Sequence, residues 1–401
     1  MIRTLFATVP TVFCTRMWDG SEEVIGVGNP LFVLVFRDEQ TFASLIRSQD
    51  AYAFAMAYCE DRLDVEGDLY AALRLKAVLR NVRPSWRAKL VIAAQLGLRM
   101  RHSRAEDKKN IQHHYDVSND FYKLFLDTRV MAYSCAYFHG EDESLEDAQE
   151  HKVDLICRKL RLKQGEHLLD IGCGWGGFLI HAAKNYGITG VGVTLSQNQY
   201  DLARQRVAQA GLSDTITIEL RDYRDLTDAS FDKIASVGMV EHVGVRRFPE
   251  YFGTAYRLLK EGGLFLNHGI VVNRNGTHTA EGQFMMTHIF PNAEMDNISH
   301  TCEVAEDAGF ELLNMESLRP HYAKTLREWE CRLVAHWDEA VRHSSLRTCR
   351  SWRLYFVGCA LAFEEGRVSV CQSLLAKPSS SSSDPQAKGP WPVPLTPHDV
   401  Y

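Results

Sequence analysis

Apolar and polar positions follow two different periods along the chain. From residue 165 onward, short apolar runs that end at turn residues alternate with stretches in which apolar residues recur at helical spacing. This alternation predicts an α/β domain with a doubly wound, mostly parallel sheet that binds its ligands at the carboxyl ends of the strands. The expected strands cover residues 167–171, 188–195, 215–220, 231–239, 263–272, 310–315 and 368–375. The expected helices cover residues 178–186, 197–210, 248–259, 326–341 and 349–363.

The N-terminal part has a different pattern. Residues 22–36 are rich in β-formers and are interrupted by Gly-Asn-Pro, whereas residues 42–58 and 69–78 have helical spacing. We therefore expect a small α+β domain with no catalytic constellation. The predicted organisation is an N-terminal domain over 1–73, a basic helical linker over 74–109, a catalytic domain over 110–377, and a Ser/Pro-rich tail over 378–401 that we expect to be disordered.

Composition restricts the class of protein. The 401 residues are 45% hydrophobic and 24% charged, as in an ordinary globular protein of two domains. No apolar run is long enough for a membrane-spanning helix, and the first residues lack the pattern of a secretory signal. None of the ten cysteines forms a C-x-x-C pair, which indicates free thiols in a reducing cytoplasm. The net charge of −6 argues against a surface built to bind nucleic acid.

The predicted linker carries a local positive charge. Residues 74–109 contain eleven Lys and Arg but only two acidic residues, a net charge of +9. Apolar residues and Trp86 lie between the basic ones, a composition suited to the surface of a bilayer. A solvated helical linker between two domains explains the same composition. Both interpretations stay open at this point.

A glycine-rich stretch follows the first expected strand of the α/β domain. It reads Asp170-Ile-Gly172-Cys-Gly174-Trp-Gly-Gly177 and opens a helix, so its backbone can approach a ligand closely. The spacing also satisfies the dinucleotide pattern, but the acidic residue expected about 20 positions later is missing. The stretch therefore predicts a nucleoside-type ligand other than NAD, with a tight turn that binds nothing as the alternative.

Four separated motifs, in a fixed order, resemble the cyclopropane fatty acid synthase family of S-adenosylmethionine-dependent methyltransferases. The resemblance covers residues from about 105 to 376. The N-terminal part resembles, more loosely, the extra domain of the phospholipid-acting members, which the mycolate-acting members lack. The motifs are residues 110–138, the glycine-rich stretch 169–177 with its continuation 192–199, residues 236–244 and residues 321–329.

The resemblance implies a set of residues around S-adenosylmethionine. Tyr133 and Ser134 would contact the methionine carboxylate, and Gly172 and Gly174 would lie behind the ligand at the turn that Asp170 precedes. The remaining implied contacts are Thr194 and Leu195 beside the ribose, Gln199 at the amino-acid part, and Asp222 and Tyr223 beside the adenine.

A second constellation concerns acid–base chemistry. Taken singly, Cys135, His268 and Tyr322 could be ordinary core residues, while Glu241 is a carboxylate at a strand end that is seldom buried without a partner. The resemblance implies that these four side chains and the backbone of Ile270 hold a bicarbonate ion. Such an ion would serve as the base that removes a proton after an alkene has been methylated.

These observations predict a cyclopropane-fatty-acyl-phospholipid synthase that uses S-adenosylmethionine and bicarbonate. The alternative is a fatty-acid C-methyltransferase whose product is methyl- or methylene-branched, because residues 282–295 depart from the family pattern in a segment that shapes the acyl channel. A silent lipid-binding protein and a nucleic-acid methyltransferase fit the motifs less well. The expected partners are unsaturated phospholipid acyl chains, without nucleic acid or metal. The expected location is cytoplasmic and peripheral to the inner face of the membrane, and the resemblance leaves a homodimer open.

Overall fold

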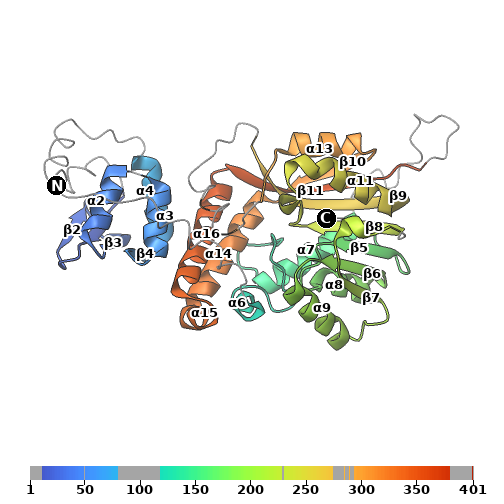
Figure 1. Ribbon diagram of the computed structural model, residues 1–401, viewed down its shortest axis with the longest axis horizontal. Helices are drawn as coiled ribbons and strands as arrows, with labels where there is room; N and C mark the ends of the chain where they lie inside the picture. Colours follow the sequence, from blue (N-terminus) through green and yellow to red (C-terminus); the bar gives the residue numbers. More distant parts are fainter. Residues whose placement is uncertain are drawn as a thin grey trace. The chain divides into compact units, whose positions relative to one another are not determined.

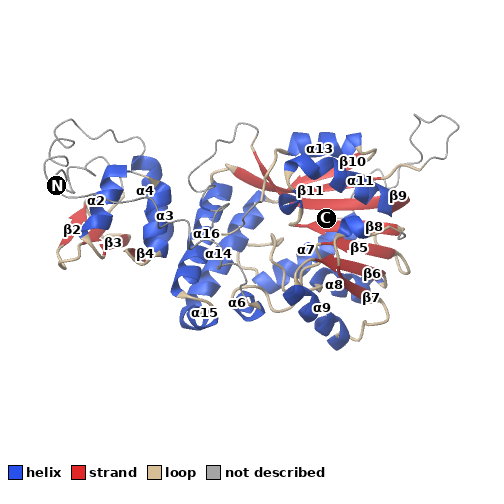
Figure 2. Cartoon of the chain, in the orientation of Figure 1, coloured by secondary structure: helices blue, strands red, loops and turns tan. Residues whose placement is uncertain are grey.

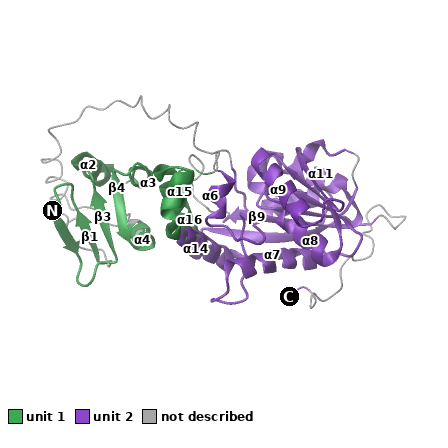
Figure 3. Cartoon of the chain, turned by 90° about the horizontal axis from the view of Figure 1, so that it is seen from below, with its two compact units in different colours: residues 1–117, 277–291, 333–361 green, residues 118–276, 292–332, 362–401 purple. Residues whose placement is uncertain are grey.

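The computed structural model divides the chain into two compact units (Figure 3). Unit 1 comprises residues 1–117, 277–291 and 333–361, and unit 2 comprises residues 118–276, 292–332 and 362–401. The structure describes residues 11–48, 50–79, 118–227, 230–273, 284, 289, 293–379 and 400. Most of the predicted basic linker and of the Ser/Pro-rich tail therefore lies outside the described residues.

Unit 1 contains a four-stranded sheet with the strand order β2-β1-β3-β4. Its strands are β1 (Phe13–Arg16), β2 (Glu22–Ile25), β3 (Phe32–Phe36) and β4 (Leu63–Gly67). Its N-terminal helices are α2 (Glu39–Ser48), α3 (Ala51–Cys59) and α4 (Leu69–Leu79). The prediction of one continuous helix over 42–58 is wrong. The side chain of Asp50 accepts a hydrogen bond from the backbone N–H of Tyr52, and this cap begins a new helix.

Unit 2 is built on a seven-stranded sheet with the order β10-β11-β9-β8-β5-β6-β7. The strands from β9 to β7 pair in parallel, while β11 pairs antiparallel with both β9 and β10. The predicted doubly wound, mostly parallel sheet is thus confirmed. Its strands are β5 (His167–Ile171), β6 (Thr189–Thr194), β7 (Ile216–Leu220), β8 (Phe231–Val237), β9 (Leu259–Val272), β10 (Glu311–Ser317) and β11 (Val368–Ala376).

Helices cover both faces of this sheet (Figures 1 and 2). One face packs against α7 (Leu145–Lys159), α8 (Gly177–Tyr186) and α9 (Gln197–Gln209) through residues such as Leu168 and Leu266. The other packs against α11 (Phe248–Leu258) and α13 (Ile298–Asp307). Both faces of the central strands are consequently buried, which explains why the strands are continuous apolar runs.

The late helices differ from their predicted bounds. Residues 326–341 were expected as one helix, but α14 (Arg319–Ala335) ends before α15 (Trp337–His343) begins. The second expected helix is α16 (Leu346–Glu364). Residues 333–361 group with unit 1, whereas the sequence pattern placed them in the segment 110–377. Within the described residues, no helix is both long and apolar enough to cross a bilayer.

Candidate active site

The glycine-rich turn connects β5 to α8 under tight steric limits. Gly172 has a φ of +82°, and a Cβ added there would lie 3.0 Å from Cγ of Met239. A Cβ on Gly177 would lie 1.9 Å from the carbonyl oxygen of Val130. Gly174, by contrast, has open space where its Cβ would be. Protein atoms therefore pack closely against the turn at Gly172 and Gly177, while the space beside Gly174 is open and could admit a ligand.

The carboxyl end of β6 places three of the predicted residues beside this turn. The backbone N–H of Gly172 donates to the carbonyl oxygen of Val193, which joins the two strand ends. Thr194 Oγ1 donates to Gln199 Oε1 at 2.8 Å, so these two side chains orient each other. Leu195 is 74% exposed, and an apolar side chain at this edge is free to contact a ribose or a base.

The carboxyl end of β7 contributes Asp222 and Tyr223. Asp222 begins a short 3-10 turn by accepting the backbone N–H of Arg224, and it also accepts two guanidinium N–H groups of the same residue. These hydrogen bonds lower the pKa of Asp222. Tyr223 is buried and meets the ring of Tyr251 edge-on at 5.8 Å. Asp222 therefore carries a fixed negative charge next to a buried aromatic ring.

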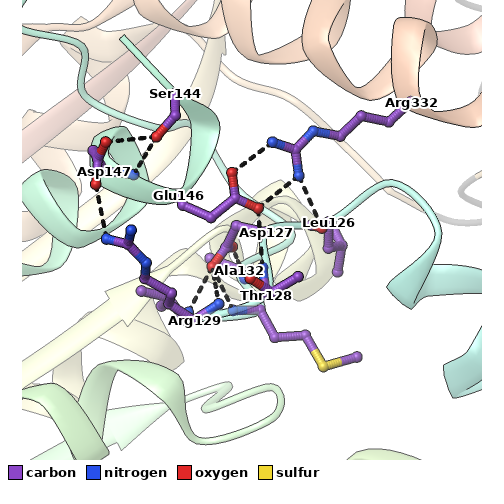
Figure 4. Close-up of polar contacts among 11 residues, drawn as sticks. Leu126, Asp127, Thr128, Arg129, Ala132, Ser144, Glu146, Asp147 and Arg332 are labelled. Carbon is purple, nitrogen blue, oxygen red and sulfur yellow. Dashed lines mark hydrogen bonds and ion pairs between the residues drawn. The ribbon is translucent and has the colours of Figure 1, made fainter.

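Tyr133, Ser134 and Cys135 belong to a loop that precedes α7, and Figure 4 shows how the neighbouring residues Asp127, Arg129 and Ala132 fix this loop. The buried carboxylate of Asp127 accepts four backbone N–H groups, those of residues 129, 130, 131 and 132. Arg206 on α9 donates to the carbonyl oxygens of residues 129, 130 and 175. The loop is thus fastened both to itself and to the glycine-rich turn.

A buried lysine lies behind this loop. Lys152 on α7 donates to Ser134 Oγ at 2.9 Å and is only 3% exposed. Burial lowers the pKa of Lys152 to about 8 and raises that of Asp170 to about 7. The ammonium group moderates the shift of Asp170 by direct attraction. Lys152 therefore orients Ser134 and supplies positive charge where the resemblance places a methionine carboxylate.

The proposed acid–base residues Glu241 and Ile270 are in direct contact. Glu241 follows β8, and its Oε1 accepts the backbone N–H of Ile270 at 2.6 Å. Its Oε2 is buried and has no hydrogen-bond partner among the residues that the structure describes. Burial raises the pKa of Glu241 to about 6. The resemblance assigned the Ile270 backbone to bicarbonate, whereas here that N–H orients the carboxylate.

His268 lies two residues earlier on β9 and is held in one tautomer. Lys159 can only donate, and its Nζ lies 2.8 Å from Gln372 Oε1, so the amide NH₂ of Gln372 faces His268. That NH₂ donates to Nδ1 of His268 at 3.1 Å. Nδ1 is therefore an acceptor, and the proton of the neutral ring sits on Nε2, which is buried and has no partner in the described part of the chain.

The charge state of His268 follows from the same surroundings. Burial, reinforced by the nearby ammonium groups of Lys152 and Lys159, lowers its pKa to about 3. The ring is therefore neutral at physiological pH and presents one N–H donor. The Nε2–H of His268 is thus a donor without a hydrogen-bond partner among the described residues, and Glu241 Oε2 is an acceptor without one. An ion that both donates and accepts hydrogen bonds, as bicarbonate does, could satisfy both groups.

Cys135 and Tyr322 meet at the start of α14. Cys135 Sγ lies 3.8 Å from the carbonyl oxygen of Leu318, which also accepts the backbone N–H of Tyr322. Burial raises the pKa of the Cys135 thiol far above its usual value, so the thiol is not a nucleophile. The fully buried ring of Trp329 lies between Tyr322 and Tyr133, at 6.1 and 5.1 Å from their rings.

Backbone contacts join the two groups of residues. The N–H of Gly238 donates to the carbonyl oxygen of His268, and a Cβ on Gly238 would lie 3.9 Å from Cβ of Ser134. The predicted catalytic and cofactor residues therefore all lie in unit 2, on its strands and the turns that follow them, on the loop before α7, and, for Gln199 and Tyr322, on α9 and α14. Sequence reasoning missed four supporting residues, namely Asp127, Lys152, Lys159 and Gln372. The sequence does indicate Lys152 and Lys159, because their spacing places them on the same face of α7 as the apolar residues Val153 and Ile156.

The fold and this arrangement of strand ends define an S-adenosylmethionine-dependent methyltransferase. The comparison with protein families then identifies the group. The chain belongs to the mycolic acid cyclopropane synthetase family, whose model matches residues 102–373. The predicted family and enzyme class are thereby confirmed.

Individual relatives differ in how much of the chain they match. A probable fatty acid methyltransferase of Pseudomonas putida is 39% identical over 390 residues, or 96% of this chain and 95% of the relative. Cyclopropane mycolic acid synthase 1 of Mycobacterium tuberculosis is 37% identical over 274 residues, or 66% of this chain and 95% of the relative. The crystal structure of mycolic acid cyclopropane synthase CmaA1 complexed with SAH and CTAB has a TM-score of 0.62 at 36% identity and covers 66% of this chain and 96% of that chain.

Proposed function

We propose that this enzyme transfers a methylene group from S-adenosylmethionine to a cis double bond in an acyl chain of a phospholipid, with bicarbonate as the base. The observation that carries the proposal is the pair of buried, unused polar atoms at the acid–base site, Glu241 Oε2 and the Nε2–H of His268. A buried donor and a buried acceptor without protein partners are costly unless a ligand satisfies both.

Each residue has a defined task in this proposal. When bound, S-adenosylmethionine supplies an electrophilic methyl group and bicarbonate supplies a base. Glu241 would accept a hydrogen bond from the hydroxyl group of the ion, and the Nε2–H of His268 would donate one to another of its oxygens. Tyr322 and Cys135 wall the site on the side of α14, and the buried aromatic rings near Tyr133 exclude water from a cationic centre on the acyl chain.

The phospholipid substrate and the location are inferred from the rest of the chain. The P. putida relative matches 96% of the chain, whereas the mycolic acid synthase matches 66%, so the former aligns with most of the first hundred residues. The basic, Trp-containing segment within residues 74–109 suits an anionic membrane surface. We infer peripheral association with the cytoplasmic face of the membrane.

A second candidate is a fatty-acid C-methyltransferase with a methyl- or methylene-branched product. The observation that favours it is the similarity over nearly the whole chain to the P. putida protein, which is described as a probable fatty acid methyltransferase. Both reactions begin with the same methylation of an alkene and differ in what the resulting cation does next. Loss of a proton from the new methyl group with ring closure gives the cyclopropane, and loss of a neighbouring chain proton gives a methyl-branched alkene. A 1,2-hydride shift followed by loss of a methyl proton gives the methylene branch. The residues that would position the base are the same in both cases, so product analysis must decide.

The test is incubation of the purified protein with S-adenosylmethionine and mono-unsaturated phospholipid vesicles, followed by mass spectrometry and proton NMR of the fatty acids. A gain of one methylene with high-field ring protons supports the cyclopropane synthase. The same gain with vinyl or branched-methyl signals selects the second candidate. No gain from either phospholipid or free fatty acid would overturn both.

A matched variant tests the site itself. Glu241→Gln should bind S-adenosylmethionine as the wild type does but lose at least ~100-fold in turnover, the scale of a lost acid–base contribution. Turnover by the wild type should fall in bicarbonate-free buffer and recover when bicarbonate is added, while the variant should not respond. Unchanged turnover of Glu241→Gln would remove this residue from the site.

A further inference from the structure

A group of metal-ligand side chains lies outside the site described above. His139, Glu143 and His151 each place one possible ligand atom within 4.8 Å of the other two. Among the residues that the structure describes, this is the one group of three or more His, Cys, Asp or Glu side chains with such spacing. It lies in the loop that follows Phe138 and on the second turn of α7.

The three side chains already contact one another. Nδ1 of His151 lies 2.7 Å from Oε1 of Glu143, and the imidazole rings of His139 and His151 stack with centroids 3.9 Å apart. The other carboxylate oxygen of Glu143 accepts the backbone N–H of His139. Glu143 is only 13% exposed, so its charge is partly desolvated and is costly unless a cation is near.

The loop itself is fixed from the other side. Lys324 on α14 donates to the carbonyl oxygens of Gly140 and Glu141 and lies over the ring of Phe138. Ser144 caps α7 by accepting the N–H of Asp147. The group is therefore not three side chains on a free loop.

We propose that His139, Glu143 and His151 bind a divalent transition-metal ion of the zinc type, with water completing the shell. Two imidazoles and one carboxylate are a recurrent ligand set for zinc, with distances near 2 Å that lie within reach of these atoms. The ion would brace the loop 139–143 against α7. It would act on stability, because none of its ligands is among the acid–base residues.

The experiment uses the full chain without a histidine tag, stripped with EDTA, in a Cys331→Ser background because Cys331 is an exposed thiol that binds the same ions. Zn²⁺ is titrated calorimetrically, and Co²⁺ is followed by its visible absorption. We expect one ion per chain and a thermal unfolding midpoint that rises with Zn²⁺ concentration.

Two variants and one control decide the outcome. His139→Ala and His151→Ala should each weaken Zn²⁺ binding by more than the ~10-fold that even an outer-shell partner can contribute, and should remove the stabilisation. His343→Ala is the control, since His343 also lies beside a surface glutamate, Glu339, at 3.8 Å. No saturable binding to the stripped protein, or equal loss in the His343 control, would overturn the proposal. Because His139 is exposed, its variant should fold, which keeps the test decisive.

Discussion

Gln372 decides which nitrogen of His268 carries the proton, although it lies 104 positions away in the sequence. In Gln372→Glu, the carboxylate has no N–H to give to Nδ1 and must accept from it. The proton should move to Nδ1, and Nε2 should face the site as a bare acceptor. We expect turnover to fall at least ~100-fold with little change in the affinity for S-adenosylmethionine.

The tautomer itself provides a readout that a general structural defect would not reproduce. Nitrogen-15 NMR of histidine-labelled protein distinguishes the two neutral tautomers, and a His268→Asn sample identifies the signal. Gln209→Glu, on the exposed side of α9, introduces the same charge as a control and should leave both the tautomer and the turnover unchanged. A His268 signal that keeps its Nε2 proton in Gln372→Glu would contradict the assignment.

Glu241 should also make the stability of the protein depend on pH. Its pKa is about 6 in the folded chain and about 4.5 when unperturbed. Between these values the folded state holds the proton more tightly than the unfolded state, so the free energy of unfolding falls as pH rises. The shift corresponds to about 2 kcal/mol.

Glu241→Gln removes this contribution. Relative to the wild type, the variant should therefore gain stability by about 2 kcal/mol when pH is raised from about 4 to about 7. Denaturant unfolding of both proteins at the two pH values measures the difference, in which all other titrating groups cancel. A constant difference across this range would mean that the carboxyl group is not desolvated in the folded protein.

At the scale of single residues, the sequence was most informative where a motif ties a residue type to a strand end. Glu241 could be proposed from the sequence because it follows an apolar run directly, whereas His268 lies within its strand and was implied by the family resemblance. Gln372 could not, because a lone polar residue in the last strand has several explanations until its partners are known. Its link to Lys159 spans 213 positions, which no local pattern records.

Among the elements, the turn between β5 and α8 has the least tolerance for change. A methyl group on Gly177 would lie 1.9 Å from the carbonyl oxygen of Val130, which also accepts a hydrogen bond from Arg206. Gly177→Ala must therefore push away the loop that carries Ser134 and Cys135. We expect a loss of at least ~3 kcal/mol in stability and weaker binding of S-adenosylmethionine.

Gly253 offers a control within the same unit. It lies inside α11, and a Cβ there meets no atom within 4 Å. Gly253→Ala should thus stabilise the protein by ~0.5–1 kcal/mol, because alanine is the better helix former. Thermal unfolding and calorimetric binding of S-adenosylmethionine compare the two variants. Equal effects would contradict a steric role for the missing side chain at Gly177.

The strands were predicted more accurately than the ends of the helices, and each outcome has a physical reason. Strands such as 167–171 were placed correctly because a buried strand in a parallel sheet is apolar on both faces. The helix breaks near Asp50 and His336 were missed because apolar spacing continues across them. At Asp50 a capping side chain begins the new helix without changing that spacing, whereas His336 makes no capping hydrogen bond with its side chain.

For the whole molecule, the division into two units depends on contacts between residues that are far apart in the sequence. Arg350, only 6% exposed, donates to the carbonyl oxygens of Tyr58 and Leu63 and to the carboxylate of Asp64, 286 positions away. These bonds draw residues 333–361 into unit 1. The sequence pattern showed two domains but assigned this stretch to the other one, since nothing local marks Arg350 as a buried cation.

The proposed membrane association belongs to this largest scale, and it rests on charge alone. Arg83, Arg87 and Lys89 lie in the basic segment, outside the described residues, and they surround Trp86. Charge reversal of all three should weaken binding to anionic vesicles, because each basic residue near such a surface contributes about 1 kcal/mol. The difference should be largest at low ionic strength, where the electrostatic attraction is least screened.

A second triple variant separates this local effect from a change in net charge. Reversing Arg221, Lys260 and Arg367 alters the net charge equally, but these residues are exposed and each pairs with a nearby carboxylate in unit 2. Co-sedimentation with anionic and with zwitterionic vesicles, at low and high salt, compares both variants with the wild type. If the two triple variants bind equally well, the segment is a linker and not a membrane contact. Selective loss in the first variant, confined to anionic vesicles, ties the basic segment to an anionic lipid surface.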